Sequence, residues 1–379
     1  MNFSFVEQQL LSQKQKYRYR QRLAVHENSG RELLVDGKKY LNFSSNDYLG
    51  LNNHPAINKA LQQGADKYGT CATGSNLVTG FNFAHQALEE SICSWLNKPR
   101  CLLFNSGFSA NAGVLTTLAN NETQFWLDKL CHASLIDGAL SSKAKVKRYL
   151  HNDYQQLNSL LKNKSAKNNL IVSEGVFSMD GDQSNIKQLL SLAKQHDSWL
   201  YVDDAHSIGV IGDQGQGSSS NGNIDIVMAT MGKSLATSGA FVVCDESVYE
   251  YLVNFARHYI YSTAISPAIA WATKASIDLA QKENWRRQKI KSLSELFTTH
   301  LDPTVKIIPT NSSIHAIVLG DEKKALICSE QLKKKGIWLT AIRPPTVPMN
   351  TSRLRVTLCA SHNEHDIIHL ANNINEIMV

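Results

Sequence analysis

Short apolar runs alternate with helix-like stretches through the middle of the chain, from about residue 55 to residue 265. Two helical stretches are His85–Leu96 and Ala110–Leu118, and the turn Asn105-Ser106-Gly107 opens the second. The apolar runs that we predict to be strands are Cys101–Phe104, Gln124–Leu127, Asn169–Ser173, Trp199–Asp203, Ile224–Thr230 and Ala240–Val243. Strands that alternate with helices favour a mostly parallel sheet with helices on both faces. The middle of the chain is therefore predicted to be an α/β domain.

The two ends of the chain show a different pattern. Phe5–Arg22 is predicted to be a polar helix, and Glu32–Phe43 a hairpin that turns at Gly37. After Pro267 come stretches predicted as two helices and three strands, namely Ala268–Gln281, Asn284–Phe297, Val305–Ile308, Ile314–Val318 and Arg353–Thr357. We predict an N-terminal helix and hairpin segment (1–45), a large domain (46–268) and a smaller α+β domain (269–379).

Charge and composition narrow the classes of partner. The 379 residues include 39 lysines and arginines against 33 aspartates and glutamates, a mild excess of +6. The densest basic runs, Lys143–Arg148 and Lys333–Lys335, are predicted to be solvated faces of helices or loops. No basic motif interleaved with aromatic residues supports nucleic-acid binding. A weakly basic surface would suit an acidic carrier protein or a nucleotide-bearing thioester.

Cysteine spacing and the length of the apolar stretches indicate the compartment that we expect. The seven cysteines are scattered and form no CxxC pair, which argues against a disulfide framework or a zinc knuckle. No stretch approaches the roughly 20 apolar residues of a membrane span. We therefore expect a cytoplasmic protein without a membrane segment.

One candidate site lies where the strand Trp199–Asp203 ends. Asp203 and Asp204 follow the apolar run, and His206 comes two residues later. Ligands of open α/β sheets bind outside the carboxyl ends of the strands, so Asp203 is predicted to face one. The competing interpretation is an acidic pair that caps the next helix.

A second candidate is Lys233 in Thr230-Met231-Gly232-Lys233-Ser234, after another predicted strand. A nucleotide-binding phosphate loop would need glycine six residues before this lysine, and that residue is Val227. Most lysines are surface residues, but this one lies between an apolar strand and the small-residue run 236–240. We therefore predict that Lys233 projects into a cleft.

Together these residues suit pyridoxal phosphate (PLP). The cofactor needs a lysine amine for a Schiff base and a carboxylate beside its pyridine nitrogen. Its phosphate needs hydroxyls and backbone N–H groups at the start of a helix. The residues that we predict to complete this site are Ser106, Gly107, Phe108, the ring-stacking His132 and the hydroxyl of Ser178. His362 and His365 have helical spacing but no further ligand, so we predict a solvated helix start and no metal site.

Several segments carry a resemblance to a known family. The segments are Leu41–Leu51, His85–Glu90, Glu174–Asp182, Val202–Gly212, Phe255–Thr263 and Ala341–Pro348. The chain resembles the α-oxoamine synthases, which are PLP enzymes of fold type I, over nearly its whole length. The resemblance implies a mostly parallel sheet of the seven-stranded type and a homodimer. The chain departs from the family's pattern at Cys71-Ala72, at Ser207-Ile208 and at Ala236, where small residues or glycine are usual.

The resemblance also implies a role for each site residue. Lys233 would hold PLP and move the α-proton, Asp203 would pair with the pyridine nitrogen, and His206 with the phenolic oxygen. Arg355 would hold the carboxylate of an amino acid. The remaining implied contacts are Ser178 and Thr230 with the cofactor, Thr263 with the phosphate of the other subunit, and Arg20, Asn46, His132 and Thr346 with substrate.

The segment Ala341–Pro348 resembles the family members that condense L-alanine with a pimeloyl thioester in biotin synthesis. The pimeloyl group would arrive on coenzyme A or on acyl carrier protein, and the sequence does not choose between them. A related synthase that uses glycine is the alternative. A nicotinamide dehydrogenase would need G-x-G-x-x-G after an early strand, which is absent. A non-catalytic binding protein is disfavoured because every expected reactive group is present.

Overall fold

The computed structural model describes residues 3–378, which fold into two compact units. The large unit comprises Leu51–Phe177 and Gln183–Arg287. The split unit collects three separate pieces of the chain, residues 3–50, 178–182 and 288–378. This grouping differs from the sequence division at residues 45 and 268. The N-terminal hairpin is not a separate segment, because its second strand pairs in parallel with residues 337–338.

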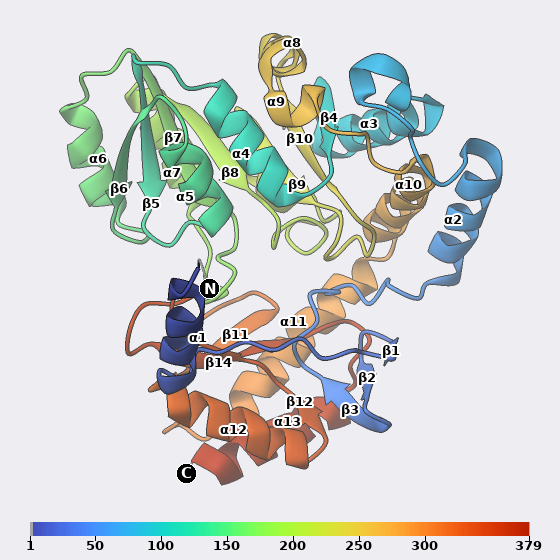
Figure 1. The fold of residues 1–379 in the computed structure, drawn as a ribbon, viewed down its shortest axis with the longest axis vertical. Coiled ribbons are helices and arrows are strands. Elements are labelled where there is room, and N and C mark those ends of the chain that lie inside the picture. The colour runs from blue at the N-terminus through green and yellow to red at the C-terminus, as the bar shows by residue number, and fades with distance from the viewer. Residues whose placement is uncertain (1–2, 379) are drawn as a thin grey trace. The chain divides into compact units, whose positions relative to one another are not determined.

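A seven-stranded sheet forms the centre of the large unit, with strand order β4-β10-β9-β8-β7-β5-β6 (Figure 1). Only β10 runs antiparallel to its neighbours β4 and β9. The strands are β4 (Arg100–Phe104), β5 (Thr123–Asp128), β6 (Lys145–Tyr149), β7 (Asn168–Glu174), β8 (Trp199–Asp203), β9 (Ile226–Thr230) and β10 (Ala240–Cys244). The central strands are buried along almost their whole length, which explains their continuous apolar sequences.

Nine α-helices of the large unit accompany this sheet in the described chain. They are α2 (Pro55–Tyr68), α3 (Phe83–Leu96), α4 (Gly107–Thr117), α5 (Ala133–Leu140), α6 (Tyr154–Lys162), α7 (Ile186–Gln195), α8 (Glu246–Phe255), α9 (Arg257–Ile260) and α10 (Pro267–Lys282). A π-helical turn at Asn76–Gly80 and a 3₁₀ turn at Gly217–Asn221 complete the unit. Gly138 lets α5 approach α4, because a Cβ there would lie 2.9 Å from the Cα of Ala112.

Within residues 3–378, the split unit contains two small sheets, three whole helices and most of a fourth, α11. One sheet has the order β1-β2-β3-β12, and the other the order β11-β14-β13. The strands are β1 (Glu27–Asn28), β2 (Glu32–Val35), β3 (Lys38–Asn42), β11 (Ile314–Gly320), β12 (Ile337–Trp338), β13 (Ala341–Ile342) and β14 (Ser352–Thr357). The helices are α1 (Phe5–Gln15), α11 (Asn284–His300), α12 (Glu322–Lys334) and α13 (Glu364–Met378). The apolar faces of α11, α12 and α13 share one core with Phe43 from the N-terminal part.

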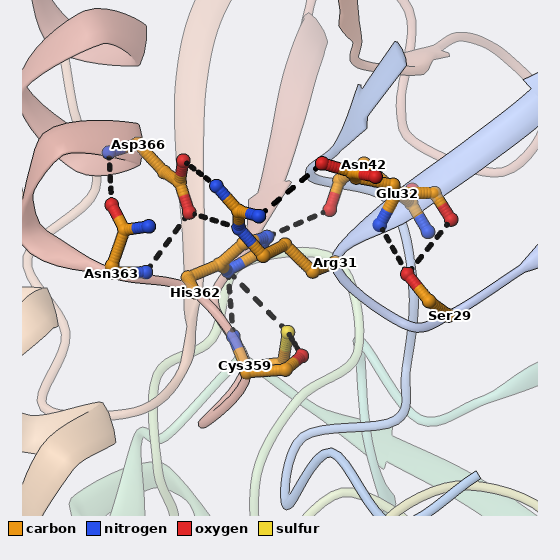
Figure 2. Close-up of polar contacts among 9 residues, drawn as sticks. Ser29, Arg31, Glu32, Asn42, Cys359, His362, Asn363 and Asp366 are labelled. Carbon is orange, nitrogen blue, oxygen red and sulfur yellow. Dashed lines mark hydrogen bonds and ion pairs between the residues drawn. The ribbon is translucent and has the colours of Figure 1, made fainter. Parts of the chain in front are cut away.

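A polar cluster ties the N-terminal hairpin to the start of α13 (Figure 2). Arg31 donates from Nε and Nη2 to the two oxygens of Asp366 at 2.7 and 2.8 Å. His362 accepts from the backbone N–H of Cys359 at Nδ1 (3.1 Å), so its Nε2 carries the hydrogen that is donated to the carbonyl of Asn42 (3.0 Å). Burial lowers the pKa of His362 to about 4. This histidine is buried, so the predicted solvated helix start is wrong for His362, although His365 is exposed.

Three local predictions also differ from the structure. The N-terminal helix ends at Gln15 and not at Arg22, because Tyr17 adopts the left-handed conformation (φ 56°). Val305–Ile308 is not a strand and makes only one isolated bridge, between Ile307 and Ile317. The basic run Lys143–Arg148 is not a helix or loop face, because most of it forms the edge strand β6. Exposed lysines are common on such edge strands.

Candidate active site

Lys233 lies just beyond the end of β9, in a tight turn. Its Nζ is 2.8 Å from Nε2 of His206, which follows the neighbouring strand β8. The backbone carbonyl of Lys233 accepts from the N–H of Ala236, and Ala236 has a left-handed φ of 52°. This conformation explains why glycine is usual at that position in the family. Lys233 and His206, which were predicted separately as site residues, therefore lie together at the carboxyl edge of the sheet.

Asp203 ends β8 and is almost fully buried. Its Oδ2 accepts from Nδ2 of Asn111 at 2.8 Å, and its Oδ1 accepts from the N–H of Ala205 at 2.9 Å. Asn111 is itself fixed by the hydroxyl of Tyr201, which donates to Asn111 Oδ1 at 2.6 Å. The carboxylate is thus held in one orientation by neutral donors, and no cation of the described chain forms an ion pair with it.

The adjacent carboxylate, Asp204, has a structural role. It accepts from the N–H and the hydroxyl of Ser218 at 2.6 and 2.5 Å, and burial raises its pKa to about 7. Gly217 passes so close that a Cβ would lie 2.3 Å from Asp204 Oδ2. Asp204 therefore anchors the 217–218 turn. The two carboxylates of the motif have separate tasks, and neither caps a following helix.

His132 is the N-cap of α5, where its Nδ1 accepts from the backbone N–H of Ser134. The backbone N–H of His132 donates to Oε1 of Glu174 at 2.5 Å. Burial lowers the pKa of His132, while the charge of Asp203 raises it and the charge of Lys233 lowers it. Glu174 is fully buried, and its pKa is raised well above the usual range by burial and by the charge of Asp203. His132, Glu174, Asp203 and Lys233 therefore form one electrostatic cluster.

The predicted phosphate nest lies at the start of α4. Ser106 is the N-cap, and its Oγ accepts from the N–H of Ser109 at 3.1 Å. A Cβ on Gly107 would lie 2.6 Å from Cγ2 of Thr230, so only glycine fits between the two elements. The hydroxyl oxygen of Thr230 is buried and has no hydrogen-bond partner among the described residues. Such an orphaned hydroxyl beside a helix N-terminus suits an anionic group.

Two neighbours of this nest were also predicted. Phe108 is half exposed, and the carbonyl of Thr263 accepts from Nδ2 of Asn105 at 2.9 Å, one residue before Ser106. This contact places the backbone of Thr263 beside Asn105 of the same chain, and the contact of Thr263 with the phosphate of the other subunit stays a prediction.

Arg355, on β14 of the split unit, is a buried cation held by neutral groups. Its Nε donates to the carbonyl of Ser178 at 2.6 Å, and Nη1 and Nη2 donate to Asn46 Oδ1 at 3.1 and 3.2 Å. The hydroxyl of Tyr48 lies 3.4 Å from Nη2. No carboxylate of the described chain forms an ion pair with it. Since a buried guanidinium is costly without an anion, this arrangement indicates a site for a carboxylate ligand.

The split unit contains a second candidate substrate site, the Arg20 pocket. It has a volume of about 300 Å³ and is lined by Tyr19, Arg20, Gln21, Thr340, Ala341, Ile342, Arg343 and Thr346. Arg20 Nη2 donates to Oγ1 of Thr346 at 3.1 Å, as expected for residues that share a ligand. Burial and the nearby charge of Arg20 lower the pKa of Arg343. The described residues supply neither arginine with a carboxylate partner.

Sequence reasoning missed Asn111, Tyr201, Glu174 and Tyr48 as individual members of these sites. The available signal was positional. Asn111 is a polar residue on the buried face of α4, and Glu174 is an acid at the end of the buried strand β7. The described residues contain no cluster of histidine, cysteine and acidic side chains that could hold a metal ion.

Comparison with known proteins places this geometry in a family. The model for aminotransferase class I and II matches residues 38–374. The 8-amino-7-oxononanoate synthase of Photobacterium profundum is 45% identical over 366 residues, which cover 95% of this chain and 93% of the relative. That of Saccharophagus degradans is 43% identical over 383 residues, with 99% and 96% covered. The chain belongs to the 8-amino-7-oxononanoate synthase family.

Solved structures agree with this assignment. The 8-amino-7-oxononanoate synthase of Francisella tularensis superimposes with a TM-score of 0.75 at 31% identity, covering 89% of this chain and 97% of that one. The serine palmitoyltransferase of S. paucimobilis, solved with a PLP–myriocin aldimine bound, has a TM-score of 0.93 at 26% identity and covers 99% and 97%. The predicted fold class, a fold-type I PLP transferase, is confirmed.

Proposed function

We propose that this protein condenses L-alanine with a pimeloyl thioester, using PLP, to give 8-amino-7-oxononanoate, CO2 and the free thiol carrier in biotin synthesis. The observation that carries the proposal is the contact between Lys233 and His206 beside the oriented carboxylate of Asp203. The kinship with named synthases at 45% identity supports the choice of reaction.

The residues present fit PLP. The buried hydroxyl of Thr230 lacks a partner, and the space beside Gly107 admits no side chain. Asp203 is buried and faces neutral donors, so it is available to hold the proton of a pyridine nitrogen. When bound, PLP supplies an aldehyde that condenses with amines and a ring that accepts electrons from the α-carbon. We assign the phosphate to Ser106, Gly107, Phe108 and Thr230, with Thr263 contributed across a homodimer.

The remaining side chains of the site bind the substrates, cover the cofactor ring and transfer protons. Arg355 binds the carboxylate of alanine through its fork of donors, and Asn46 keeps that fork in place. His132 covers the cofactor ring, and Ser178 adds a hydroxyl near it. The amine of Lys233, once released from the cofactor, takes the α-proton of alanine and later returns one. His206 orients this amine and the phenolic oxygen. Arg20 and Thr346 contact the acyl substrate.

The proposal also includes the cell compartment, which we expect to be the cytoplasm. All seven cysteines are free, which suits a reducing cytoplasm. Among the described residues, no helix is both long and apolar enough to cross a membrane. The glycine-using synthase is the second candidate, but the Arg20 pocket is built from the segment that resembles the alanine-using members.

Two measurements test the proposal. The purified protein should show the absorbance of protein-bound PLP, and borohydride should fix the cofactor to Lys233 in the unmodified protein but not in Lys233→Ala. Supplied with pimeloyl thioesters, the protein should release thiol with alanine and not with glycine. A protein that ignores added PLP, or that releases thiol only with glycine, contradicts the assignment.

A further inference from the structure

The Arg20 pocket lies beside an unusually basic segment. The only acid among residues 1–26 is Glu7, and the segment contains five cations in alternate positions, Lys14, Lys16, Arg18, Arg20 and Arg22. One of them fixes the segment on the unit, because Arg18 Nη2 lies 2.7 Å from Oε1 of Glu322 at the start of α12. The neighbouring Lys14 and Lys16 are exposed.

The start of α12 adds two more exposed cations, Lys323 and Lys324. They lie in the first turn of the helix, where the positive end of the helix dipole disfavours a cation. Asp321 and Glu322 face the same turn, but Asp321 caps the helix and Glu322 is paired with Arg18. The two lysines therefore do not stabilise α12. Residues that violate a local rule in this way are expected at functional surfaces.

Contacts place two of these cations, Lys14 and Lys323, near the pocket wall. The Lys14 ammonium lies 5.0 Å from the ring centre of Tyr19, a residue of the pocket wall. The Lys323 ammonium lies 5.8 Å from the ring centre of Tyr17, whose carbonyl accepts from Arg343 of the same wall. We call Lys14, Lys16, Lys323 and Lys324 the basic rim. None of the four has an ion-pair partner in the described part of the chain.

A second basic surface in the split unit lacks these features. A hollow of about 570 Å³ is lined by Lys38, Lys39, Tyr40, Glu330, Lys333, Lys334 and Gly336. It contains an acid of its own, and none of its residues is a candidate substrate contact. It therefore serves as a matched control surface with the same number of lysines.

We propose that the basic rim is the docking surface for an acidic acyl carrier protein that presents the pimeloyl thioester to the Arg20 pocket. This inference rests on the proposed function and chooses between its two possible carriers. Charge complementarity is the first support, because opposite charges guide encounter and fix orientation. The rim draws its lysines from two separate elements, the end of α1 and the start of α12.

Helix α1 supplies the second support for a protein partner. It buries none of its residues, and its side chains Phe5, Val6, Leu10 and Leu11 are 44–58% exposed. An amphipathic acidic helix of a carrier can cover apolar side chains and meet the neighbouring lysines at once.

The test compares two variants with equal charge change. The rim variant is K14E/K16E/K323E/K324E, and the control is K38E/K39E/K333E/K334E. With alanine and pimeloyl-acyl carrier protein, the rim variant should lose about tenfold or more in kcat/KM at low salt, and high salt should reduce that difference. With pimeloyl-coenzyme A, the two variants should differ by less than about twofold. Both should keep the absorbance of bound PLP.

Four other outcomes would count against the basic rim as a docking surface or against the proposed function. An equal loss in the control variant would show an effect of net charge alone and would overturn the proposal. A loss with pimeloyl-coenzyme A alone would mean that the rim binds nucleotide phosphates and not a protein, and an equal loss with both thioesters would mean that the rim acts on a part that both donors share. Either result would overturn the proposal. If the unmodified protein uses neither thioester, the proposed function fails, and binding of fluorescent carrier protein without an acyl group still tests the rim by the same pair of variants. The double variant K323E/K324E repeats the test should the fourfold variant not fold.

Discussion

Two clusters of buried polar groups show opposite designs. In the cluster of the split unit, His362 uses both ring nitrogens, and Asp366 receives two donors from Arg31 and one from Asn363. In the cluster of the large unit, Thr230 keeps a buried hydroxyl that has no hydrogen-bond partner among the described residues, and the Nζ of Lys233 lies 2.8 Å from Nε2 of His206. The first cluster is complete by itself and stabilises the fold. The second is complete only with a ligand, which marks it as the place of chemistry.

Substitution of Arg355 should have the largest effect on activity. This buried guanidinium forms no ion pair with a carboxylate of the described chain, so it also needs a ligand to be complete. Arg355→Ala removes charge-assisted hydrogen bonds to the amino-acid carboxylate, so the KM for alanine should rise about 10- to 100-fold. The absorbance of bound PLP should not change, because no cofactor contact is lost. Arg355→Lys should recover part of the loss, since it keeps the charge without the fork. A KM that stays at the value of the unmodified protein would place the alanine carboxylate elsewhere.

His362, in the complete cluster, should make the free energy of unfolding depend on pH in the acid range. His362 is buried and neutral, with its pKa lowered to about 4 from the usual 6.5. Between these values the unfolded chain binds the proton and the folded chain does not, so this stability is full above pH 6.5 and falls towards pH 4. Urea unfolding should show a loss of about 2 kcal/mol from this residue between pH 7 and pH 5. His362→Gln should flatten that slope, and an unchanged slope would contradict this account.

Substitution of Arg31 should have the smallest effect, and only on the free energy of unfolding. The side chain of Arg31 is 35% exposed, while Asp366 is nearly buried. Arg31→Ala should lower the free energy of unfolding by about 1–2 kcal/mol, because one partner of a half-buried ion pair is removed. PLP binding and the KM for alanine should stay unchanged. An effect on either would mean that the complete cluster also serves the reaction.

The sequence predicted the parts whose cause is local. Buried strands β7, β8 and β9 have continuous apolar runs, and the residues after β8 and β9 carry Asp203, His206 and Lys233 at one edge of the sheet. The parts that depend on distant residues were not predictable. Burial of His362 comes from stacking on Phe43, more than 300 positions earlier.

Edge strand β6 illustrates the same limit, since its exposed lysines give it no apolar pattern and pairing with β5 alone makes it a strand. In the candidate site, the orienting role of Asn111 depends on its contact with Asp203, from a different element. The roles assigned to individual site residues stay predictions until the experiments above are made.

The split unit has a consequence for how the protein is made. Its first 50 residues leave the ribosome early, but strand β3 pairs with β12, which lies almost 300 residues later. The large unit can complete its sheet while synthesis continues, because all its residues precede position 288. The N-terminal hairpin must then wait, exposed, until the last quarter of the chain emerges. Truncations at either end should therefore damage the same unit, and chaperones should matter most for nascent chains that stop short of β12.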